Sequence, residues 1–129
     1  MIVSRAGAHS VNRPAGRPAV ARRCLARRGM LHSECEAVDH IRTEPHGEIE
    51  TSGRGGTDEV WLVLSGAVTV EETDSAPWTL RRDELMLSPA GARPKLTAQR
   101  DGAELLHLAV LPHSVVRQLP PRVPELPHD

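Results

Sequence analysis

Hydrophobic residues occur along this chain in short runs, several of which alternate with polar residues, and turn-forming residues separate most of the runs. Side chains on a strand point alternately to opposite faces, so this pattern is typical of β-strands. The regular spacing of many short strands predicts a sandwich or a barrel. The strands are expected at residues 2–4, 19–25, 34–43, 48–52, 59–65, 67–72, 78–80, 84–88, 93–98 and 103–111.

Turn-forming residues divide the predicted strands. They are Pro45-His46-Gly47, residues 52–56, Ser65-Gly66, residues 74–77, Pro89-Ala90-Gly91 and Asp101-Gly102. Towards the end, residues 113–119 predict a short helical turn, which Pro120-Pro121 would terminate. A Pro-rich extended tail is expected to follow.

The composition supports a single small β domain. The chain has 129 residues, with eleven Pro, ten Gly, two Trp and no Phe or Tyr. This length is enough to bury most of the surface that the unfolded chain exposes. The core must therefore consist of Leu, Val, Ala, Ile, Met and Trp.

Charge is distributed unevenly. Residues 1–33 contain seven Arg and no acidic residue, so all 17 Asp and Glu lie further along. Such an arm could contact nucleic acid, or it could lie across the acidic barrel of its own chain or of a partner. Without aromatic residues to stack on bases, nucleic-acid binding is not expected. We predict a basic N-terminal arm with edge strands at 1–33, a barrel at 34–112, and a short helix with a Pro-rich tail at 113–129.

The sequence predicts a cytoplasmic protein with no membrane contact. The apolar run Ala19-Val20-Ala21 is interrupted by Arg22-Arg23, which is too early for a secretory signal. The chain also lacks the roughly 20 consecutive apolar residues of a membrane span. Cys24 and Cys35 do not have a zinc-binding or CxxC spacing, so reduced thiols are expected.

The stretch from Thr57 to Gly66 is the most informative motif. It resembles the second half of the first cupin motif, which is His-x-His, three or four residues, Glu, six residues and Gly. Glu59 and Gly66 have the required spacing, whereas the two histidine positions fall on Gly53 and Gly55. The resemblance is to a small single-domain cupin of the RmlC-like kind whose metal-binding motifs are degenerate.

The second cupin motif is Gly, five residues, Pro-x-Gly, two residues, His, three residues and Asn. Pro89-Ala90-Gly91 matches its centre, but Asp83, Pro94 and Ala98 replace the glycine, the histidine and the asparagine. Of the four usual metal ligands, only Glu59 remains.

The resemblance implies an all-β, cupin-type double-stranded β-helix, which is a jelly-roll barrel. It also implies that no metal or other cofactor is bound in the usual way. A site with unusual ligands stays possible, because several side chains are of types that iron, manganese or zinc accept. These are His40, His46, Glu48, Glu59 and His107.

Strand alternation gives candidate site residues. If Glu59 faces the barrel interior, as its motif position implies, Trp61 does too. Glu59 could transfer protons, and Trp61 could stack on a substrate. A buried carboxylate needs a cation or a raised pKa. The candidate cations are Arg54, Arg93, His107 and His46.

Four residues are considered for a role in the site, two of them with alternatives. Arg54, between glycines, could hold an anion, or it could lie in an exposed hairpin. Asp39 is expected to face inward, as a substrate contact. His46 resembles a residue at the barrel mouth. His107, in the closing strand, is either a hydrogen-bonded core residue or a catalyst.

Three functions remain open. The first is a lyase or isomerase, of dehydratase or cyclase type, that uses metal-independent acid and base chemistry in a biosynthetic pathway. Glu59, His46 and His107 would be catalytic, and Trp61, Arg54, Arg93 and Asp39 would bind a small-molecule substrate. The second is a non-catalytic ligand-binding or accessory cupin, and the third is a metal enzyme with non-standard ligands. The resemblance also implies a homodimer, which an outward apolar face around Leu62 would suit.

Overall fold

The computed structural model describes residues 10–27, 35–49, 56–111, 116–118 and 120. This part of the chain is almost entirely β-structure, as the sequence predicts. The predicted helical turn at 113–119 falls largely outside it; of the described residues there, Val116 is helical and residues 117–118 form a turn. The strands are β1 (Ser10–Asn12), β2 (Val20–Arg27), β3 (Cys35–Thr43), β4 (Glu48–Ile49), β5 (Asp58–Glu71), β6 (Trp78–Arg81), β7 (Leu85–Ser88) and β8 (Lys95–Val110).

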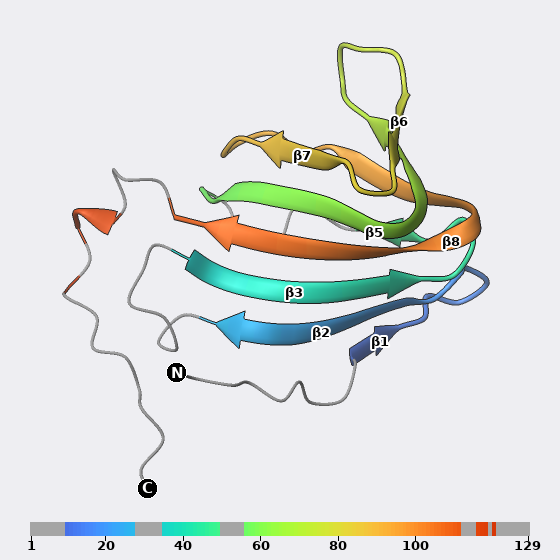
Figure 1. Ribbon diagram of the computed structural model, residues 1–129, viewed down its shortest axis with the longest axis horizontal. Coiled ribbons are helices and arrows are strands. Elements are labelled where there is room, and N and C mark those ends of the chain that lie inside the picture. The colour runs from blue at the N-terminus through green and yellow to red at the C-terminus, as the bar shows by residue number, and fades with distance from the viewer. Residues whose placement is uncertain (1–9, 28–34, 50–55, 112–115, 119, 121–129) are drawn as a thin grey trace, which may run out of the picture.

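All pairings between these strands are antiparallel, and the order along the main path is β1-β2-β3-β8-β5-β6. The two long strands, β5 and β8, run side by side and curve along their length (Figure 1). The first half of β5 pairs with β7, and its second half pairs with β6. The second half of β8 pairs with β3, and its first half pairs with β4. The two long strands thus link two groups of strands, as in a jelly roll.

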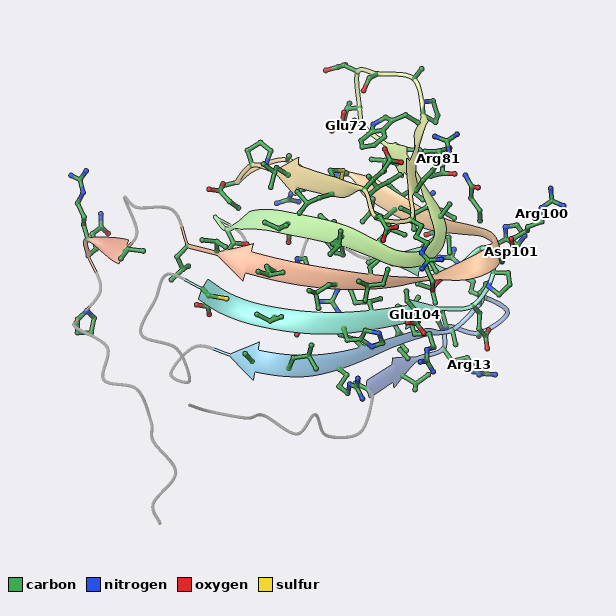
Figure 2. The ribbon with its side chains drawn as sticks, in the orientation of Figure 1. Arg13, Glu72, Arg81, Arg100, Asp101 and Glu104 are labelled. Carbon is green, nitrogen blue, oxygen red and sulfur yellow. The ribbon has the colours of Figure 1, made fainter. Side chains whose placement is uncertain are left out.

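Two predicted turns are instead bends inside continuous strands. At Ser65-Gly66 and at Asp101-Gly102 the chain does not reverse, and the β5–β8 pairing continues across both with shifts of register. Gly66 and Gly102 have φ values of 73° and 70°. Glycine adopts this conformation without steric cost, so a bulge can bend the strand where a turn was expected. Figure 2 shows Arg100 and Asp101 pointing outward at the bend of β8.

The hydrophobic core joins both groups of strands. It consists of aliphatic side chains and one Trp, as the composition requires. Alternate positions on each strand supply it, because only one face is inward. Its members are Ile41, Ile49, Trp61, Val63, Val68, Val70, Leu80, Met86, Leu96, Ala98, Ala103 and Leu105.

The opposite face of β5 is also apolar and continues onto its neighbours. Leu62 pairs with Leu85 on β7 and with Leu106 on β8. Leu85 and Leu87 are 53% and 70% exposed. The homodimer expected from such a face stays a prediction. None of the described residues forms a helix of the length and hydrophobicity that a membrane span needs.

Candidate functional site

Three ionisable residues from three neighbouring strands meet inside the barrel. Asp39 on β3 is paired in register with His107 on β8, and His107 is paired with Trp61 on β5. Glu59 precedes Trp61 by two residues and therefore lies on the same face of β5. Asp39, Glu59 and His107 are 2%, 7% and 2% exposed.

The three residues form a row of alternating charges together with Arg22 of β2. Arg22 Nη1 donates a hydrogen bond of 3.0 Å to Asp39 Oδ2. His107 Nδ1 lies 3.8 Å from the same oxygen, and His107 Nε2 lies 3.4 Å from Glu59 Oε1. Both distances from the His107 ring are long for hydrogen bonds. Neither ring nitrogen forms a hydrogen bond of ordinary geometry with a described residue. The imidazole is thus held between two carboxylates at ion-pair distance.

The environment of His107 favours its protonated form. Burial is the largest single influence and lowers the pKa of the imidazole. Asp39 and then Glu59 raise this pKa, and the charge of Arg22 lowers it slightly. The two carboxylates outweigh burial, so the pKa of His107 is raised above its ordinary value of 6.5.

Trp61 positions His107 and does not face the cavity. The two rings are stacked, with centroids 3.9 Å apart and planes at 22°. Trp61 is completely buried, so its predicted role of stacking on a substrate does not fit this structure. The reason is that the cross-strand neighbour on β8 already covers the ring, and the sequence does not reveal that pairing.

A cavity of about 490 Å³ adjoins the row of charges. This volume is within the range of small-molecule sites, roughly 300 to 1,000 Å³. The cavity brings together three residues that the sequence analysis proposed as catalytic, His46, Glu59 and His107. Its lining residues are Ser10, Asn12, Pro14, Arg17, Pro18, Val20, Arg22, His46, Glu48, Ile49, Glu59 and His107.

The remaining predicted residues lie elsewhere. Asp39 faces inward as expected, but it lies behind His107 and does not line the cavity. Arg93 is exposed before β8 and is not a lining residue, while Arg54 is outside the described residues. Of the proposed cations that the structure describes, His107 is the one in contact with Glu59.

Sequence reasoning missed Arg17 and Arg22, which both line the cavity. Both belong to the basic arm, which was interpreted as a surface segment. The alternation of Val20 and Arg22 on one face of β2 was the available signal. It could not show that β2 pairs with β3 beside Asp39.

Of the possible ligands of an unusual metal site, His46, Glu48, Glu59 and His107 line the same cavity, whereas His40 does not. His40 lies 3.6 Å from Glu104, on the face of β3 opposite to Asp39. No group of three or more His, Cys, Asp or Glu residues in the described part of the chain has the arrangement of a metal site.

Comparison with known proteins gives a clear result for fold alone. No family model matches the sequence, and no curated protein matches it significantly. Several solved structures are similar. A predicted oxalate decarboxylase from Thermotoga maritima has a TM-score of 0.65 and 13% identity, covering 86% of this chain and 100% of the other. The Cnp3 cupin domain of Schizosaccharomyces pombe has a TM-score of 0.64 and 9% identity, covering 84% and 73%.

A cupin 2 barrel protein from Salinispora arenicola gives a TM-score of 0.62 at 12% identity, covering 77% of this chain and 81% of the other. The chain therefore has the cupin fold, which confirms the resemblance seen in its two motifs. At such low identity the comparison reveals the fold and no particular activity, because one barrel supports many chemistries.

Proposed function

We propose that this protein is a small-molecule lyase or isomerase that uses acid and base chemistry in the cupin cavity. The observation that carries the proposal is the contact between His107 and Glu59, two groups of opposite charge that line the same cavity. A carboxylate and an imidazolium held side by side are a base and an acid within reach of one ligand.

The direction of proton transfer follows from the pKa of His107. Because this pKa is raised, the protonated imidazole is favoured at the start of a reaction, and it serves as the acid. The Glu59 carboxylate then serves as the base that removes a proton next to a carbonyl. The reverse assignment, in which a histidine takes the proton and Glu59 returns it, fits the raised pKa of His107 less well. His46, exposed at the rim, contacts the other end of the ligand.

The residues behind the cavity support these roles. Asp39 stabilises the imidazolium at Nδ1, and Arg22 holds the Asp39 carboxylate in place by donating a hydrogen bond to it. Trp61 fixes the plane of the ring by stacking. The water-poor surroundings strengthen all of these charge interactions.

The proposal is tested by hydrogen exchange in D₂O with a panel of small 2-oxo, 3-oxo and 3-hydroxy acids and aldehydes. The wild-type protein is expected to exchange the proton next to the carbonyl of at least one of them, as measured by loss of its NMR signal. Glu59→Gln should reduce this exchange by at least about a hundredfold, the usual contribution of a positioned base.

Glu71→Gln is the matched control, since Glu71 is an exposed acid at the other end of β5 and its replacement should leave exchange unchanged. A non-catalytic binding cupin predicts the opposite result. If panel members bind in the cavity and none exchanges faster than in buffer, or if Glu59→Gln exchanges as fast as wild type, the acid and base proposal is wrong.

A further inference from the structure

We infer that the cavity binds a small monocarboxylate, whose carboxylate group is held by Arg17. This inference rests on the proposed function, because it names the class of substrate that the same cavity would take. It depends on where the charges lie, on how the Arg17 turn is fixed and on the geometry of the guanidinium group.

The acidic side chains in and behind the cavity already have cationic partners. Glu59 contacts His107, and Asp39 is paired with Arg22. At the cavity edge, Glu48 Oε1 lies 3.3 Å from Lys95 Nζ.

Arg17 is different, because its guanidinium forms no ion pair with any residue in the described ranges, although it lines the cavity. Because the charges of the acidic residues and of their cationic partners cancel, the guanidinium of Arg17 leaves the cavity with one positive charge in excess. A ligand with a single negative charge would balance it.

The turn that carries Arg17 is fixed from both sides. The Arg17 N–H donates to the carbonyl of Pro14 at 3.0 Å, and Gly16 has a φ of 70°, which closes the turn. Glu44 joins this turn to β3. Its Oε1 lies 3.3 Å from Arg13 Nη2, and its Oε2 accepts a hydrogen bond of 2.9 Å from the Ala19 N–H.

The same carboxylate therefore holds the turn at both ends. Glu44 also accepts a backbone hydrogen bond from Gly47, which follows His46 in the next turn. Arg17 and His46 are thus held on two linked turns of the cavity wall, so the backbone position of Arg17 is set before any ligand binds, while its side chain is exposed.

A carboxylate suits this position because its single negative charge balances the positive charge of Arg17. The planar guanidinium donates two parallel hydrogen bonds to a carboxylate. The cavity, at about 490 Å³, has room for a small acid that extends from Arg17 to Glu59 and His107. The carbon skeleton would then present a proton next to its carbonyl group to the Glu59 carboxylate.

The test is a binding titration and needs no turnover. Acetate, pyruvate, lactate and crotonate are titrated by NMR, following the Arg17 backbone amide and the His107 ring, with the neutral amide of each acid and inorganic phosphate as comparisons. At least one acid should bind about tenfold or more tightly than its amide. Arg17→Gln should remove this preference and Arg17→Lys should retain part of it.

Arg100→Gln is the matched control, because Arg100 points outward at the β8 bend (Figure 2), and it should bind the acids as wild type does. Thermal unfolding should show that Arg17→Gln is folded, since only the backbone of Arg17 serves the turn. The inference is overturned if every acid binds no better than its amide, if Arg17→Gln binds as wild type does, or if phosphate binds as tightly as the best acid. Binding through Arg17 without exchange in D₂O would leave this inference standing and refute the proposed chemistry alone.

Discussion

Replacing His107 with glutamine is expected to lower the free energy of unfolding by about 3 to 5 kcal/mol, the usual cost of removing one partner from a buried ion pair. Glu59 is 7% exposed, and His107 is its cationic contact among the described residues. Without the imidazolium, the carboxylate is left uncompensated in a buried site. Chemical denaturation of the two proteins at pH 6 measures the difference.

The double variant Glu59→Gln with His107→Gln is the control for this interaction. It should be less destabilised than the sum of the two single variants, because the second replacement removes the uncompensated charge. Purely additive losses, or a loss below about 1 kcal/mol in His107→Gln, would show that the two residues do not form an interacting pair.

The same residue makes stability depend on pH. A group with a raised pKa in the folded state stabilises the protein fully below its pKa in the unfolded chain. That contribution is lost as the pH rises from about 6.5 through the higher folded pKa. The wild-type protein should therefore lose stability over this range, and His107→Gln should not show the same loss.

Gly66→Ala is expected to destabilise the fold by roughly 2 to 4 kcal/mol, through backbone strain and a steric clash. Gly66 has a φ of 73°, and a methyl group at this position would collide with the carbonyl oxygen of Gly102. Since both glycines lie where β5 and β8 bend, the clash would push the two long strands apart. The change in free energy is measured by chemical denaturation.

Gly16→Ala separates the two causes of this effect. Gly16 has nearly the same φ, 70°, but a methyl group there would meet no atom within 4 Å. Its replacement should cost only the conformational penalty of about 1 to 2 kcal/mol. Equal losses in the two variants would mean that the contact between Gly66 and Gly102 contributes nothing to the bend.

The fold could be predicted from the sequence because short-range patterns of residues determine most of it. The alternation around Glu59 placed Glu59 and Trp61 on the inward face, and the Glu59 to Gly66 spacing indicated the barrel. The same short-range logic failed at Gly66 and Gly102, because a glycine with positive φ serves a reversing turn and a bulge equally well. It also missed β1, since Ser10–Asn12 has no hydrophobic alternation.

The site was less predictable, because it depends on pairing between distant segments. His46, Glu59 and His107 could be named as chemically suitable residues, but only the β5–β8 and β3–β8 registers show how His107 lies between Asp39 and Glu59. For the same reason, the sequence could not show that the Trp61 ring stacks on the ring of His107. Arg17 lies in a turn whose position depends on Glu44, a contact across 25 residues between Ala19 and Glu44.

The central claim is that His107 is a protonated acid held between Asp39 and Glu59. An NMR titration of its ring nitrogens from pH 5 to 9 tests this claim most directly, with Glu59→Gln in parallel. We predict that the ring titrates above the ordinary pKa of 6.5 in the wild-type protein and at a lower pH in the variant, because a neutral amide no longer favours the imidazolium. A wild-type midpoint at or below 6.5, or the same midpoint in both proteins, would contradict the account.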